Sequence, residues 1–192
     1  MTINLQKGQK ISLDKDGSQL HGRVIMGLGW DAKTKKGLFS FLSSSEIDLD
    51  ASCVVMDTTG KMIDAVWFEQ LKSLDGSIEH TGDNVTGQGE GDDEQIKIDL
   101  AKVPPHVQSL VFVVNSFSGE TFERIANAYC RLVDQASGQE VARYQLNCPG
   151  RHTAMVMAKI YRHQGKWGMH AIGENAVGKT FHELLPVITA NI

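Results

Sequence analysis

Short runs of apolar and β-branched residues, separated by turn residues, recur along almost the whole chain. Turn signals such as DTTG at 57–60 and SG at 137–138 stand between these runs. Ten short strands at this spacing favour an all-β fold, an antiparallel β-sandwich, over alternating βαβ units. The predicted strands are Lys10–Leu13, Arg23–Leu28, Ala51–Met56, Lys61–Phe68, Gln95–Leu100, Gln108–Asn115, Ala126–Val133, Glu140–Leu146, Thr153–Tyr161 and Lys166–Ile172.

Helical signal is confined to two short segments. Phe122–Asn127 is expected to form one turn. Thr180–Leu185 has the pattern of a short amphipathic C-terminal helix that ends before Pro186, because proline lacks the N–H that a helix interior needs. Gly37–Glu46 is expected to be a loop of small and apolar residues. With no linker and no internal repeat, the sequence predicts one domain over residues 1–192.

Charge changes this picture because the acidity of the chain is concentrated in one segment. The net charge is −4, yet seven acidic residues and no lysine or arginine fall between Ser73 and Ile96. The rest of the chain carries 19 basic and 16 acidic residues. A nucleic-acid-binding protein would show a basic stripe with interleaved aromatic residues instead. We therefore expect no nucleic-acid partner.

The compartment is predicted from what the chain lacks. No stretch approaches 18 consecutive apolar residues, and the N-terminus MTINLQKGQK has no apolar run of a signal peptide, so a soluble cytoplasmic protein is expected. The three cysteines, Cys53, Cys130 and Cys148, are far apart and never form a CxxC pair. This spacing argues against a disulfide framework, a zinc ribbon and a redox pair, and it favours buried thiols.

The acidic segment contains the sequence GDNVTGQGEGDDE at 82–94, which has the composition of a calcium-binding loop. Its four glycines allow the backbone to wrap tightly and to point carbonyl oxygens inward. Side-chain oxygens come from Asp83, Asn84, Thr86, Asp92, Asp93 and Glu94. Ca²⁺ takes six to eight such oxygens, whereas zinc prefers His and Cys. The alternative is a solvated acidic hairpin without an ion.

The loop does not follow the EF-hand pattern, although Asp83 and Glu94 hold the first and last places of a twelve-residue loop. Val85 stands at the third position, where an oxygen ligand belongs. Gln88 stands at the sixth position, where the EF-hand requires glycine.

A second group of carboxylates lies upstream. Asp48 and Asp50 in IDLDAS are two residues apart, so they project from one strand face while Leu49 points into the core. Asp31, at the end of GLGWD, is a further candidate ligand. Together these carboxylates and the loop supply enough oxygens for two Ca²⁺ ions. The alternative is that the aspartates only protect an edge strand from aggregation.

Three motifs that carry the acidic residues, GLGWD (27–31), IDLDAS (47–52) and GDNVTGQGEGDDE (82–94), resemble the TerD family of tellurite-resistance and stress proteins. LQKGQKISL (5–13) and NAYCRLVD (127–134) extend the resemblance over nearly the whole chain. IDLDASCVVMD and VVNSFSGETF are closest to the TerZ branch of the family.

The resemblance implies a β-sandwich that binds two Ca²⁺ ions through the acidic motifs. It also implies a gene cluster that protects bacteria against tellurite, phage and colicins. Members of the family are thought to be calcium-dependent interaction modules on the cytoplasmic side of the inner membrane. Their expected partners are other proteins of the cluster and an integral-membrane protein. The family transfers no catalytic residue, so we expect no enzyme activity; whether calcium is regulatory or purely structural stays open.

Two other functions have a basis in the residues. GENAVGKT, Gly173–Thr180, matches the P-loop pattern GxxxxGK[ST] and would bind a nucleotide, although a P-loop needs a parallel sheet that the strand pattern does not predict. Cys53 would serve a thiol-dependent tellurite reductase, although no resolving cysteine or basic neighbour accompanies it in the sequence.

Overall fold

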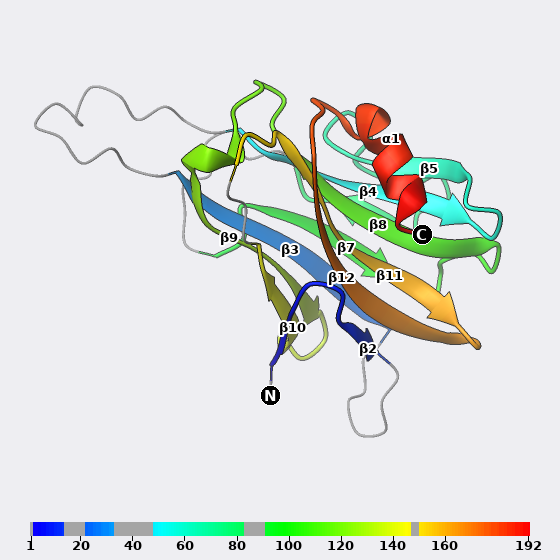
Figure 1. Cartoon of the computed structure of the whole chain (residues 1–192). Helices are drawn as coiled ribbons and strands as arrows, with labels where there is room; N and C mark the ends of the chain where they lie inside the picture. Colours follow the sequence, from blue (N-terminus) through cyan, green and yellow to red (C-terminus); the bar gives the residue numbers. More distant parts are fainter. Residues whose placement is uncertain (1, 14–21, 33–47, 83–90, 147–149) are drawn as a thin grey trace, which may run out of the picture.

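The computed structural model describes residues 2–13, 22–32, 48–82, 91–146 and 150–192 (Figure 1). Within these residues the strands form two six-stranded sheets that pack face to face around one apolar core. Both sheets contribute to that core: Leu28 and Leu132 come from the first sheet, and Leu110 and Phe112 from the second. This arrangement confirms the predicted all-β sandwich. The predicted loop Gly37–Glu46 lies outside the described residues.

The first sheet has the strand order β1-β10-β9-β3-β7-β6. Its strands are β1 (Ile3–Leu5), β10 (Glu140–Gln145), β9 (Ile125–Asp134), β3 (Arg23–Ala32), β7 (Glu94–Asp99) and β6 (Ile78–His80). Burial alternates along β7, where Glu94, Ile96 and Ile98 are buried and the residues between them are half-exposed. The inner face of this sheet is therefore apolar, and its outer face is polar and borders solvent.

The second sheet has the strand order β2-β12-β11-β8-β4-β5. Its strands are β2 (Lys10–Ser12), β12 (Lys166–Ala176), β11 (Ala154–His163), β8 (Val107–Asn115), β4 (Asp50–Asp57) and β5 (Met62–Val66). Strands β4 and β8 are buried on both faces over most of their length. All ten predicted strands are confirmed. One pairing departs from the expectation of a wholly antiparallel sandwich, because β1 pairs with β10 in parallel.

The C-terminal helix α1 (Phe181–Ala190) covers part of the outer face of the second sheet, as Figure 1 shows. Phe181, Leu184 and Ile188 are buried against apolar side chains of β8, β11 and β12. The prediction that this helix ends before Pro186 was wrong, since the proline lies inside it. The three apolar anchors lie on one helix face, and their packing offsets the hydrogen bond that proline cannot donate.

The expected helical turn at Phe122–Asn127 is present only in its first half. A 3-10 helix, η2 (Phe122–Arg124), is followed directly by β9 at Ile125. Phe122 is buried in the core and fixes this turn at the end of the sandwich.

Because Pro186 is exposed, its ring contributes little packing, and its cost to α1 should be measurable. We expect Pro186→Ala to raise the free energy of unfolding by up to about 3 kcal/mol, because the helix regains one backbone hydrogen bond. Urea denaturation checks this expectation. Thr189→Ala, at another exposed position of α1, is the control and should change stability little. Equal midpoints for Pro186→Ala and the native chain would contradict the argument.

Candidate metal site and its polar network

The two acidic motifs meet at one end of the sandwich through the carboxylate of Glu94. Glu94 begins β7 in the first sheet, and its side chain is only 1% exposed. Its Oε2 accepts a hydrogen bond of 2.6 Å from the backbone N–H of Ala51 in β4 of the second sheet. The last residue of the acidic loop thus joins the two sheets next to the Asp48/Asp50 motif.

His80 supports the same carboxylate from β6. Its Nε2 lies 3.3 Å from Oε2 of Glu94, and both side chains are buried. Its Nδ1 accepts a hydrogen bond of 3.1 Å from the backbone N–H of Gly82, where the acidic loop starts. His80 therefore ties the start of the loop to its last residue.

Asp50 lies on the outer face of the second sheet, opposite Asn115 in the β4–β8 register, and is 4% exposed. The Nδ2 of Asn115 lies 3.3 Å from Oδ2 of Asp50 and donates a hydrogen bond of 2.6 Å to the carbonyl oxygen of Lys179. The remaining amide oxygen, Oδ1 of Asn115, is buried and accepts no hydrogen bond within the described structure. A buried acceptor without a donor costs about 1–3 kcal/mol. An amide oxygen beside a carboxylate is the donor set that Ca²⁺ uses.

The neighbouring predicted ligands are placed as follows. Leu49 is buried in the core, as predicted, and Asp48 precedes β4. Asp31 is in β3, where its backbone pairs with Ala126. Asp83, Asn84 and Thr86 lie outside the described residues, as does the side chain of Asp31. Among the side chains that the structure does describe, no three of His, Cys, Asp or Glu gather closely enough to hold a metal ion.

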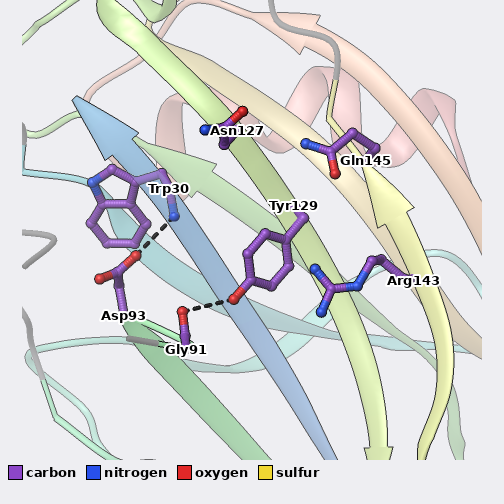
Figure 2. A pocket seen from close by; sticks show the side chains of 7 residues that line it. All are labelled: Trp30, Gly91, Asp93, Asn127, Tyr129, Arg143 and Gln145. Carbon is purple, nitrogen blue, oxygen red and sulfur yellow. Dashed lines mark hydrogen bonds between the residues drawn. The ribbon is translucent and has the colours of Figure 1, made fainter. Parts of the chain in front are cut away.

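Asp93 attaches the acidic loop to the end of β3. Its backbone N–H donates to the carbonyl oxygen of Leu28, and its Oδ2 accepts a hydrogen bond from the backbone N–H of Trp30, each at 2.8 Å. Figure 2 shows this second bond. The GLGWD and acidic-loop motifs, far apart in sequence, are therefore directly bonded.

Asp92 is the anchor between the loop and the outer face of the first sheet. Its carboxylate is 1% exposed and accepts hydrogen bonds from Nε and Nη2 of Arg131 at 2.7 and 3.1 Å. Gln95 Nε2 donates a third bond of 3.1 Å. The carboxylate lies above Gly27, where an added Cβ would come within 2.1 Å of Oδ2. Glycine at position 27 is therefore required by the carboxylate that covers it.

Next to this anchor lies a polar hollow with a volume of ≈ 640 Å³ (Figure 2). Its central residue is Tyr129, whose hydroxyl donates a hydrogen bond of 2.7 Å to the carbonyl oxygen of Gly91. The guanidinium of Arg143 lies 4.1 Å from the centre of the Tyr129 ring. Burial and the charge of Asp92 raise the pKa of Tyr129, so the phenol remains a donor at neutral pH. The other lining residues are Trp30, Asp93, Asn127 and Gln145.

The structure gives no support to the P-loop interpretation of Gly173–Thr180. Residues 174–176 belong to β12 and pair antiparallel with β11. A P-loop instead wraps around phosphate between a parallel strand and a helix. The segment connects β12 to α1. Its Lys179 carbonyl oxygen accepts a hydrogen bond from Asn115, next to Asp50.

The described cysteines have the properties of core thiols. Cys53 and Cys130 are fully buried, and Cys148 lies outside the described residues. Burial raises the pKa of both thiols, that of Cys130 to about 12. The thiolate is the reactive form, so the structure gives Cys53 no reductase chemistry.

Sequence reasoning did not predict Asn115, Arg131 or His80 as parts of the site. Asn115 and Arg131 lie within the runs VVNSF and NAYCRLVD, where only the placement of the strands shows which carboxylates they face. His80 has no histidine-ligand spacing around it in the sequence, and its partner, Glu94, is fourteen residues away.

The fold and the site define a β-sandwich with a carboxylate-rich end, and comparison with known proteins gives the family. A TerD domain matches residues 1–186. The chain is 46% identical to tellurium resistance protein TerZ of Serratia marcescens, over 95% of this chain and 94% of that protein. It is 43% identical to stress response protein SCP2 of Bacillus subtilis, over 91% and 92% of the two chains. The chain belongs to the TerD family of tellurium-resistance and stress-response proteins.

A solved structure supports the architecture. A homologue of the telluride resistance protein TerD from Streptomyces coelicolor has a TM-score of 0.64 with this chain at 19% sequence identity. The match covers 83% of this chain and 91% of the other. At this identity the likeness shows the fold, and it agrees with the two-sheet sandwich described above.

The contact between Gly27 and Asp92 predicts a coupled effect on stability. Gly27→Ala should lower the free energy of unfolding by about 1–3 kcal/mol, because the new methyl group displaces a packed carboxylate. In an Asp92→Ala background the same substitution should cost much less, since the obstructing oxygens are gone. Chemical denaturation of the two single variants and the double variant measures this coupling. Additive effects would show that the carboxylate does not set the need for glycine.

Burial of the cysteines predicts that a thiol reagent will not label them in the folded protein. In Cys148→Ser only Cys53 and Cys130 remain, and neither should react with an aromatic disulfide reagent in the folded protein at neutral pH. Both should react after addition of denaturant. Rapid labelling of the folded variant would contradict the burial of these thiols and would reopen thiol chemistry.

Proposed function

We propose that this chain is a non-enzymatic Ca²⁺-binding protein of the tellurium-resistance and stress-response system. In this proposal it acts as a calcium-dependent interaction module at the cytoplasmic side of the membrane. The observation that carries the calcium assignment is the buried Oδ1 of Asn115, which has no hydrogen-bond donor among the described residues and lies beside the carboxylate of Asp50. A hard cation would use both oxygens and offset the cost of burying them.

The proposed ligands come from both acidic motifs. Asp48, Asp50 and Asn115 would contribute from the second sheet, and Asp93 from the end of the loop. Asp31, Asp83, Asn84 and Thr86 remain ligands predicted from the sequence. With these oxygens the acidic end has enough donors for two ions.

Asp92 and Glu94 have a different role in this proposal. The carboxylate of Asp92 is neutralised by Arg131, and that of Glu94 binds Ala51 and contacts His80. Both would position the loop on its two sheets, so that the remaining oxygens converge without a large ordering cost.

Calcium would supply charge neutralisation at this end of the molecule. Acidic side chains crowded around one loop repel each other, and a divalent ion removes that repulsion while it connects the two motifs. The conformation of the acidic end would then depend on calcium, which is the property that an interaction module needs. Within the described residues, no helix is long and apolar enough to span a bilayer. Attachment to a membrane would therefore use a partner or a surface contact in this proposal.

Calcium binding should be visible as stability and as heat. At a free Ca²⁺ concentration of about one hundred times Kd, each ion that binds only the folded state stabilises it by about 2.7 kcal/mol, so two ions contribute about 5.4 kcal/mol. For a chain of this size that is a rise in Tm of about 10–20 °C relative to protein in chelator. Titration calorimetry should give a stoichiometry of two. An identical Tm in calcium and in chelator would end the proposal.

Asp50→Asn and Asn115→Ala should each weaken calcium binding by about tenfold or more, because each removes one oxygen ligand or its charge. Asp57→Asn is the matched control, since Asp57 ends the same strand and binds the Thr59–Lys61 turn. It should leave the calcium titration unchanged. If Asp50→Asn and Asp57→Asn titrate alike, the assigned ligands are wrong.

A further inference from the structure

A row of three basic side chains crosses the outer face of the second sheet, away from the acidic end. In the strand register, Lys10 of β2 lies opposite His170 of β12, and His170 lies opposite Lys159 of β11. Figure 1 shows these three strands side by side. Positive charges at directly opposed positions of a sheet repel each other. The row is therefore stable only where something compensates its charge.

Lys159 has such compensation within the fold. Its side chain is buried, and its Nζ donates a hydrogen bond of 2.7 Å to the carbonyl oxygen of Asn191 at the end of α1. The C-terminus of a helix carries partial negative charge, which favours an ammonium group there. The ammonium group of Lys159 thus binds the end of α1 and helps to hold the helix on the sheet.

Lys10 has no comparable partner. It is exposed, and no acidic side chain among the described residues forms a salt bridge with it or with Lys166. Burial lowers the pKa of His170, and the charges of Lys10 and Lys159 lower it further. The positive field at this part of the sheet is therefore not cancelled by a described acid.

A pocket with a volume of ≈ 220 Å³ lies at the Lys10 end of this row. Lys10, Tyr161, His163 and Lys166 contribute to its walls, and none of its described lining residues is acidic. Gly168 also lines it, and an added Cβ there would come within 3.1 Å of both the Tyr161 ring and a backbone oxygen. The absence of a side chain at Gly168 thus lets the Tyr161 ring pack close to the strand beside the basic side chains.

We propose that this pocket binds a phosphoryl group, with Lys10 and Lys166 as the charged contacts and His163 and Tyr161 as additional hydrogen-bond donors. Lysine recognises phosphate as a point charge on a flexible stem, and two lysines that line one pocket match a compact dianion. The volume corresponds to about seven water molecules, which is room for a phosphoryl group and the first atoms of its ester.

Two sources supply this chemistry, a soluble phosphate monoester and the headgroup of an anionic lipid. Titration of the full-length protein with inorganic phosphate and with glycerol phosphate, followed by ¹H–¹⁵N NMR, tests the first. Sedimentation with vesicles of phosphatidylcholine, with and without phosphatidic acid, tests the second. We expect amide shifts around Lys10 and Lys166, or sedimentation that requires phosphatidic acid. The proposal fails when neither probe binds.

Lys10→Gln with Lys166→Gln should weaken binding of whichever probe is active by about tenfold or more, because two charge-assisted contacts are lost. Both lysines are exposed, so the fold should be retained, as circular dichroism checks. Lys61→Gln removes one positive charge at the far edge of this sheet and should bind as the native chain does. Equal loss in Lys61→Gln, or no loss in the double variant, overturns the site.

The calcium ligands provide a second control, because phosphate also associates with bound calcium. Asp50→Asn should leave phosphate binding unchanged when binding takes place in the basic pocket. Loss of phosphate binding in Asp50→Asn, with normal binding in the double lysine variant, would place the anion at the acidic end and overturn this proposal. The two proposals therefore fail separately.

Discussion

The hydrogen bond from the Ala51 N–H to the Glu94 carboxylate is the contact on which the rest of the site depends. It links β4 of the second sheet to β7 of the first sheet, and it joins the IDLDAS motif to the last residue of the acidic loop. A buried acceptor that loses its hydrogen-bond donor costs about 1–3 kcal/mol, and a charged acceptor costs more. The relative position of β4 and β7 is therefore fixed at this end. Asp50 and Asp93 are positioned by the same bond, because each is the direct neighbour of one of its two residues.

Two glycines in β3 perform a related task on the outer face of the first sheet. The carboxylate of Asp92 occupies the space above Gly27, and the ring of Tyr129 occupies the space above Gly29, where a Cβ would come within 2.5 Å. Glycine usually weakens a strand because it has no side chain to pack. Here the missing side chains are replaced by groups from the loop and from β9. The GLGWD motif is thus explained by packing as well as by its acidic last residue.

The sequence predicted the strands well because each one has its own local pattern. It did not predict β1 and β6, which have three residues each. It ended α1 too early, because the anchors that carry the helix past Pro186 act through contacts with the sheet.

The candidate site divides in the same way. Acidic residues predicted an oxygen-rich end. The two acidic motifs meet there through the Glu94–Ala51 hydrogen bond, but among the described side chains no three of His, Cys, Asp or Glu gather closely enough to hold a metal ion. The pairing of Asp92 with Arg131, and of Asp50 with Asn115, depends on strand register, which residue composition does not encode. The family resemblance supplied what composition lacked, namely that the motifs belong to one sandwich, and the TerD match confirms that membership.

The second sheet carries opposite charges at two separated places, and this separation constrains how the two proposed sites communicate. On β11, Ala154 lies opposite Asn115, and Lys159 of the basic row is five residues further along. At about 3.3 Å per residue the two places are about 17 Å apart. The Debye length is about 8 Å at physiological ionic strength, so direct electrostatic coupling is largely screened there. Coupling between calcium and an anion would therefore require movement of α1. Just before this helix, the carbonyl oxygen of Lys179 accepts a hydrogen bond from Asn115, and at its C-terminal end the carbonyl oxygen of Asn191 accepts one from Lys159.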